Sequence, residues 1–188
     1  MKKAIVALAG IAFLTGIYSF VPGTGSKTLA PLTVNVAKSR IDWVASKKND
    51  FHTGFFPLKS GEVNVEGGKL TGGKFVIDLA NLKVTDAGGG DGLNGHLKRA
   101  DFFDVEKFAE ASYEITSVNY TGENTADISG NLTLKGASFP VKFPALIRSS
   151  DDKGFFAQAF FSVDRTALGI NYNGPSKDVQ LAIHVFAK

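Results

Sequence analysis

The chain has 188 residues, a formal net charge of +3 and no cysteine. A single domain with a substantial core is expected at this length. The lack of cysteine excludes disulfides, thiolate metal sites and a cysteine nucleophile, and the nearly balanced charge, with no basic stripe, argues against a nucleic-acid partner.

The first 26 residues have the pattern of an export signal or an N-terminal anchor. Two lysines precede a charge-free apolar run, Ala4–Val21, and a short stretch of small and polar residues follows it. This order is typical of secretory signals, and the run is just long enough to span a bilayer. We therefore expect a signal peptide or anchor at 1–26, a linker at 27–38 and a folded barrel at 39–188, in the periplasm or secreted.

Short alternating segments follow, and such alternation predicts β-strands. The segments of the first half are Leu32–Val36, Arg40–Ala45, the aromatic stretch Phe51–Pro57, Glu62–Glu66 and Leu70–Leu79. Gly67 and Gly68 separate the last two, which predicts a hairpin because both turn positions can adopt positive φ.

The hydrophobic period changes between Asn81 and Phe108. Three consecutive glycines, Gly88–Gly90, predict a loop, and residues 93–101 and 104–108 predict one or two short helices. The glycines also begin a GxGxxG match, but a dinucleotide site needs a strand before this motif and a long helix after it. We interpret the match as a flexible loop.

Longer alternating segments occupy the second half of the chain. They are Ala111–Tyr120, Ala126–Lys135, Phe139–Ile147, Phe155–Asp164 and Asp178–Phe186. One apolar and one polar face is typical of antiparallel sheets. About eight strands joined by hairpins predict a barrel or a sandwich, and eight strands are about the fewest that can enclose a ligand.

Residues with catalytic or metal-binding chemistry form no recognisable set. His52, His96 and His184 lack the spacing of metal ligands. The acidic residues between Asp101 and Glu110 are interpreted as capping and solvating short helices. We therefore expect no metal, no cofactor and no catalytic residue, and thus a protein that is not an enzyme.

Four groups of residues carry a resemblance to one known family. They are His96-Leu97-Lys98 with Asp101-Phe102-Phe103-Asp104-Val105, the strand Ala111–Val118, the strand and turn Gly130–Gly136, and Val163-Asp164-Arg165 with Gly169-Ile170. Together they resemble the YceI-like family of secreted, lipocalin-like barrels. The resemblance spans about Arg40 to Phe186. It implies an all-β fold, an extended eight-stranded antiparallel barrel with a short helical insertion near its mouth and a long hydrophobic tunnel.

The same resemblance implies a ligand, namely a polyprenyl chain or an isoprenoid quinone. We expect eight side chains to form the ligand-binding wall: Trp43, Phe75, Phe103, Tyr113, Leu132, Phe143, Phe161 and Ile170. Arg165 is expected to pair with Asp101 or Asp104 and so to fix the helical segment to the barrel. The chain departs from the family at Ala37–Arg40, where members often carry a His-Ser pair, and at the glycines of 88–92.

Three functions remain open at this point. The first is a protein that binds, and carries or stores, an isoprenoid-type lipid. The second is a secreted interaction or stress-related module with a solid core, because an apolar cavity and an apolar core use the same side chains. The third is an enzyme acting on an apolar substrate, which would need polar groups inside the barrel. Transient membrane contact and a homodimer are compatible with the sequence.

Overall fold

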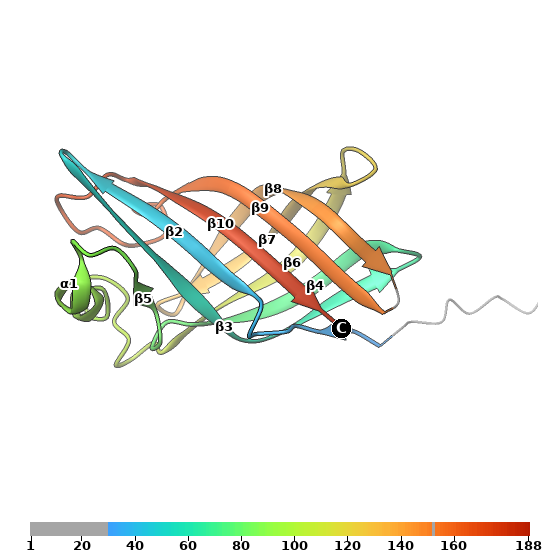
Figure 1. The fold of residues 1–188 in the computed structure, drawn as a ribbon, viewed down its shortest axis with the longest axis horizontal. Helices are drawn as coiled ribbons and strands as arrows, with labels where there is room; N and C mark the ends of the chain where they lie inside the picture. Colours follow the sequence, from blue (N-terminus) through green and yellow to red (C-terminus); the bar gives the residue numbers. More distant parts are fainter. Residues whose placement is uncertain (1–29, 152) are drawn as a thin grey trace, which may run out of the picture.

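Within the part of the chain that the structure describes, ten strands form one antiparallel sheet, and eight of them close into a barrel (Figure 1). The structure is a computed structural model that describes residues 30–151 and 153–188, so the expected signal or anchor lies outside the described residues. The barrel strands are β2 (Arg40–Lys47), β3 (Asp50–Glu66), β4 (Lys69–Asp78), β6 (Glu110–Tyr120), β7 (Thr125–Leu134), β8 (Ala137–Asp151), β9 (Gly154–Asp164) and β10 (Asp178–Ala187). Two short strands, β1 (Leu32–Thr33) and β5 (Lys83–Val84), pair with β3 outside the barrel.

The barrel closes through two pairings between strands that are not hairpin partners. β2 pairs with β10, and β4 pairs with β6 across the insertion. All other neighbours in the barrel follow one another along the chain. The expected eight-stranded antiparallel barrel with a short helical insertion is confirmed, and its strands alternate between the interior and the outer face.

β3 differs from the sequence prediction because it is one strand of 17 residues. The sequence predicts two separate segments there. The pairing with β4 shifts register between Leu58 and Ser60, so one residue is inserted and the parity of the inward positions changes. Leu58 is buried before the irregularity, and Val63 and Val65 are buried after it. The inward side chains are at even positions before the irregularity and at odd positions after it. Simple alternation in the sequence therefore does not reveal that this is one continuous strand.

The insertion contains one helix within the described residues, α1 (Gly90–Leu97). It begins in the glycine run, earlier than predicted. The second predicted helix, at 104–108, is a series of turns, and Asp104 has a φ of 50° that no α-helix accommodates. No helix in the described ranges is both long enough and apolar enough to cross a membrane.

The two ends of the barrel differ. We call one the helix end, where α1, the β2–β3 hairpin, the β7–β8 turn and the β9–β10 connection (165–177) lie together (Figure 1). Lys135 in the β7–β8 turn donates hydrogen bonds to the carbonyls of Ala100 and Phe102, at 3.1 and 2.7 Å, and so fixes the insertion. The far end carries the β3–β4, β6–β7 and β8–β9 hairpins and the C-terminus.

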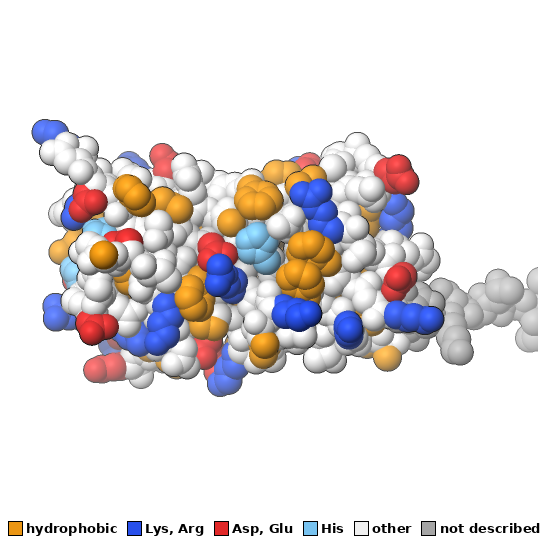
Figure 2. Space-filling view, in the orientation of Figure 1, with side chains coloured by type: hydrophobic (Ala, Val, Ile, Leu, Met, Phe, Trp, Pro, Cys, Tyr) orange, Lys and Arg blue, Asp and Glu red, His pale blue; other side chains and the backbone are white. Residues whose placement is uncertain are grey.

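The outer face is of mixed character. Figure 2 shows hydrophobic side chains lying among lysine, arginine and acidic side chains on the viewed face. Phe160 on β9 is 52% exposed, and its ring lies 6.0 Å from that of His184 on β10. Among the described residues, the large hydrophobic side chains that are exposed are Val36, Phe51 and Phe160.

A hydrophobic cavity inside the barrel

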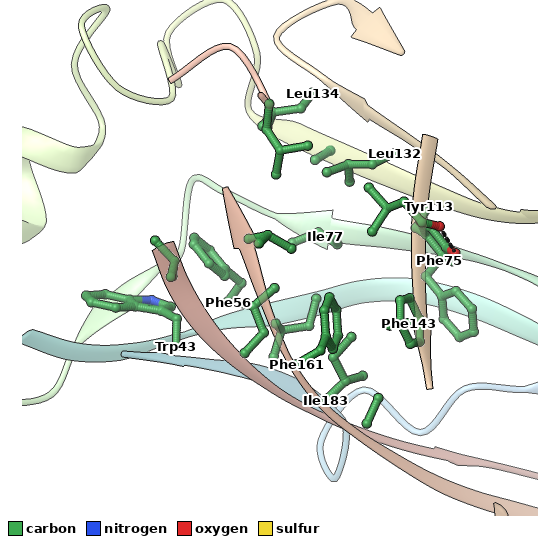
Figure 3. A pocket seen from close by; sticks show the side chains of 18 of the residues that line it. Trp43, Phe56, Phe75, Ile77, Tyr113, Leu132, Leu134, Phe143, Phe161 and Ile183 are labelled. Carbon is green, nitrogen blue, oxygen red and sulfur yellow. Dashed lines mark hydrogen bonds between the residues drawn. The ribbon is translucent and has the colours of Figure 1, made fainter. Parts of the chain in front are cut away.

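A cavity of about 290 Å³ occupies the interior of the barrel (Figure 3). Every one of the eight barrel strands contributes inward side chains to its wall, and the insertion adds Leu93, Leu97, Phe102 and Phe103 at the helix end. Nearly all of these groups are hydrocarbon. Ligand pockets in proteins begin at about 300 Å³ and are mostly apolar, so the cavity is of the size and character of a binding site.

All eight predicted wall residues line this cavity. Phe103 comes from the insertion, and Ile170 comes from the β9–β10 connection. The other six come from barrel strands: Trp43, Phe75, Tyr113, Leu132, Phe143 and Phe161. Their inward position follows from strict alternation in strands such as β7. Their contact with a ligand stays a prediction.

The middle of the interior is hollow. Leu132, Phe143 and Phe161 point toward a common space in Figure 3, yet each keeps part of its surface uncovered. By contrast Val63 and Leu82 are 0% exposed. A filled core covers its inward side chains, so the uncovered surface of the first three residues is the wall of the cavity. Phe143 and Phe161 stack with ring centroids 4.6 Å apart and form one side of that wall.

Two large aromatic rings of the wall lie against glycines of the neighbouring strand. A Cβ on Gly54 would come within 2.3 Å of Cζ2 of Trp43, and a Cβ on Gly130 within 2.5 Å of Cζ of Tyr113. Glycine inside a strand is the usual sign of such a close approach. These two glycines are the sequence signal for the orientation of both rings.

Tyr113 is the aromatic wall residue with a hydroxyl, and that hydroxyl is already bonded. It donates to the carbonyl of Val141 at 3.0 Å, and burial raises the pKa of the phenol to about 12. The phenol is therefore neutral and held against β8. It gives the wall no free acid or base.

Arg165 does not pair with Asp101 or Asp104, so that prediction is wrong. The guanidinium is buried, and it donates hydrogen bonds of 2.7 to 2.9 Å to four carbonyls of the β9–β10 connection, those of Ile170, Tyr172, Pro175 and Ser176. Five donors in a rigid fork suit a loop that curls around its own arginine. The same contacts hold Ile170 over the helix end of the cavity.

The three histidines lie apart, and no group of three or more potential metal ligands exists in the described part of the chain. His96 contacts Asp101 at 3.1 Å, and His184 lies 3.6 Å from Asp42 on the outer face. His52 lines the cavity, as does Lys47. Sequence reasoning missed both, although their position in the strand pair places them on the same inner face as Trp43.

Asp86 joins the insertion to β3 beside this part of the cavity. Its carboxylate accepts hydrogen bonds from the His52 ring at 2.9 Å and from the backbone N–H groups of Thr53 and Gly89, both at 2.7 Å. These bonds, the one from His52 first, lower the pKa of Asp86 to about 2. A fixed negative charge therefore lies behind the imidazole.

Comparison with known proteins agrees with this architecture. The family model of the YceI-like domain matches residues 32–187. A UPF0312 protein of Pseudomonas putida strain W619 is 37% identical over 108 residues, which are 56% of this chain and 54% of that protein. The match thus spans about half the length of that curated relative.

Solved structures show the same fold. The crystal structure of Burkholderia cenocepacia BcnA superposes with a TM-score of 0.71 at 21% identity, over 82% of this chain and 99% of that one. A polyisoprenoid binding domain from Saccharophagus degradans, described as implicated in plant cell wall breakdown, gives 0.65 at 16% identity, over 85% and 98%. With the family model covering the whole barrel, this chain belongs to the YceI-like family.

Proposed function

We propose that this protein binds an isoprenoid-type amphiphilic lipid, a polyprenyl chain or an isoprenoid quinone, inside its barrel and carries or stores it outside the cytoplasm. The observation that carries the proposal is the hollow, hydrocarbon-lined cavity to which all eight barrel strands contribute. The Saccharophagus degradans protein with the same fold is described as a polyisoprenoid binding domain, which supports the same class of ligand.

The shape of the cavity favours a long flexible tail. The wall runs from Leu93 and Phe103 at the helix end to Leu70 and Phe155 near the far end. A strand of ten residues rises roughly 33 Å, and a tilt of about 40° gives a bore of roughly 25 Å along the barrel axis. Covering about 300 Å² of tail surface would contribute roughly 7 kcal/mol at about 25 cal/mol per Å², before the cost of association is subtracted.

A binding role is favoured over catalysis because the wall offers little chemistry. The Tyr113 phenol is bonded to a backbone carbonyl, and the Arg165 guanidinium is bonded to four. General acid–base catalysis needs a titratable group within reach of the reacting atoms. The middle of the cavity is lined by leucine, isoleucine, valine, alanine and phenylalanine side chains.

The experiment is native mass spectrometry of protein purified from its own source, followed by extraction and identification of any bound molecule. The expected result is one lipid per chain, released on denaturation. Ala157, which faces the cavity from β9, is replaced by Phe to fill the bore. Ala182, an outward residue of β10, is replaced by Phe as the matched control.

We expect Ala157→Phe to lower lipid occupancy at least tenfold and Ala182→Phe to leave it unchanged. A clean mass without lipid, together with no uptake of polyprenyl or quinone ligands on titration, would favour the interaction module with no physiological lipid. The proposed location rests on the sequence pattern of residues 1–26, and fractionation of the producing cells with detection of the protein tests it.

A further inference from the structure

The inner face of the β2–β3 pair changes from hydrocarbon to polar toward the helix end. On β2 the inward positions run Trp43, Ala45, Lys47, and on β3 they run Gly54, His52. The register pairs Ala45 with His52 and Lys47 with Asp50. Elsewhere the cavity wall is almost entirely apolar, so this strand pair is where an amphiphile could place a polar group.

The polar groups at this position form an ordered chain. The Lys47 ammonium lies 3.4 Å from Nε2 of His52 and 3.2 Å from the Asp50 carboxylate. Nδ1 of His52 lies 2.9 Å from the Asp86 carboxylate. Because Nδ1 faces the Asp86 carboxylate, Nε2 is the ring nitrogen that lies toward the ammonium. Lys47 is therefore the donor that this strand pair presents.

A second unused donor lies further in on the same strand. Trp43 is only 5% exposed, and its indole N–H has no hydrogen-bond partner among the described residues. A buried donor without an acceptor costs about 1–3 kcal/mol. Lys47 has three N–H donors, and the two contacts above leave one of them for another acceptor. The Lys47 ammonium therefore suits a ligand oxygen, and the Trp43 ring contributes an apolar face to the cavity on the same strand.

The charges around these donors disfavour an anionic head. Three residues that can be cationic line the cavity, Lys47, His52 and Arg165. Lys47 already contacts Asp50, and Arg165 is bonded to four carbonyls. A phosphate monoester carries about −1.5 to −2 charges at neutral pH and would lie beside the carboxylates of Asp50 and Asp86. Like charges at this distance repel each other, so the two carboxylates raise the free energy of a phosphate bound here.

We propose that Lys47, His52 and Trp43, here called the head-group rim, bind the head of the lipid and select an uncharged head with a carbonyl or hydroxyl oxygen over a phosphate. The tail then runs from the helix end toward Leu70 and Phe155. This inference rests on the proposed function and adds the orientation of the ligand and the chemistry of its head.

The test uses the single tryptophan of the chain. Trp43 fluorescence is titrated with three ligands of matched tail length: an isoprenoid quinone, the polyprenyl phosphate and the headless isoprenoid hydrocarbon. We expect the quinone head to quench Trp43 strongly, and the quinone to bind at least tenfold more tightly than the phosphate. Stoichiometric quinone binding by native mass spectrometry without quenching would overturn the orientation.

Two variants separate the rim from the cavity. Lys47→Met removes the donor, and Lys48→Met changes a neighbouring lysine that does not line the cavity. We expect Lys47→Met to weaken quinone binding about five- to tenfold, the size of one ordinary hydrogen bond from this half-exposed donor, with hydrocarbon binding unchanged. Lys48→Met should change neither.

The inference is overturned if the phosphate binds as tightly as the quinone, or if Lys47→Met weakens all three ligands equally or none of them. If the hydrocarbon, the quinone and the phosphate all bind equally well, the inference about the head-group rim is wrong, while the proposed function still stands. Binding of none of the three ligands would overturn both.

Discussion

The ring of Tyr113 on β6 lies flat across Gly130 on β7, at a distance that leaves no room for a side chain at position 130. A Cβ there would come within 2.6 Å of the Tyr113 hydroxyl oxygen and within 2.4 Å of the backbone oxygen of Glu114. Trp43 and Gly54 repeat this relationship on β2 and β3. The two rings are thus held against the wall, which keeps the middle of the barrel open.

Replacing Gly130 by alanine should destabilise the barrel by about 2–3 kcal/mol, because the new methyl group overlaps backbone as well as the Tyr113 ring. Urea unfolding followed by circular dichroism measures the loss. Gly72→Ala is the matched control, since a Cβ there meets only the flexible side chain of Asn64, at 3.2 Å, and should cost less than about 1 kcal/mol. Equal losses for the two variants would show that Tyr113 and β6 relax without strain.

Leu132 and Leu82 should respond differently to truncation. Leu82 is 0% exposed and lies in a filled part of the core, so Leu82→Ala should cost about 3–5 kcal/mol. Leu132 faces the cavity and is only partly covered, so Leu132→Ala should cost about 1–2 kcal/mol in lipid-free protein. The two free energies of unfolding, measured after lipid extraction, check this. A loss at Leu132 as large as that at Leu82 would mean that the interior is solid.

Arg165 should matter far more than an exposed basic residue. Arg165→Lys removes the fork that serves four carbonyls and leaves buried acceptors without donors, which should cost about 2–3 kcal/mol. Lys142 forms an exposed ion pair with Asp127 at 2.8 Å, and Lys142→Ala should cost less than about 1 kcal/mol. Thermal unfolding of the two variants compares them. Small, similar losses would show that the β9–β10 connection holds its shape without the guanidinium.

Asp86→Asn should lower the free energy of unfolding by about 1–2 kcal/mol at pH 7, because it weakens the hydrogen bonds between β3 and the insertion. The native fold lowers the pKa of Asp86 from 3.8 to about 2, so it favours the carboxylate. This stabilisation is complete above about pH 4 and is lost as the pH falls toward 2. Urea midpoints of the wild type and the variant should therefore converge over that interval.

Asp91→Asn, in the first turn of α1, is the control for that series. Asp91 is exposed, so its replacement should change the free energy of unfolding at pH 7 by less than about 0.5 kcal/mol. A gap between Asp86→Asn and the wild type that stays constant from pH 7 to pH 2 would assign the effect to packing instead of to the carboxylate charge.

The sequence predicts the barrel wall well wherever a strand alternates without interruption. On β7, Ile128, Leu132 and Leu134 line the cavity as their alternation requires. The sequence prediction was wrong where tertiary structure interrupts the regular alternation of a strand or the regular backbone of a helix. The irregularity after Leu58 reverses the inward parity of β3, and the positive φ of Asp104 ends any helix at that point.

The polar part of the site was harder to predict for a different reason. Arg165 donates its hydrogen bonds to backbone carbonyl oxygens. Every residue type carries such a carbonyl, so the sequence does not indicate which residues are the partners. Lys47 and His52 belong to strands whose register had to be known first, because a slip of one residue would turn both outward. Residue types alone predicted an apolar interior and did not indicate where it becomes polar.

The order in which the strands are joined has a consequence for how the molecule forms. β2 is the first strand of the barrel along the chain, and its neighbours are β3 and β10, the last. The ring of hydrogen bonds cannot be completed until the residues up to Ala187 are present, since they pair β10 with both β2 and β9. Contacts between such distant segments form slowly. A nascent chain that lacks β10 would expose one edge each of β2 and β9, so closure of the barrel requires the full set of strands.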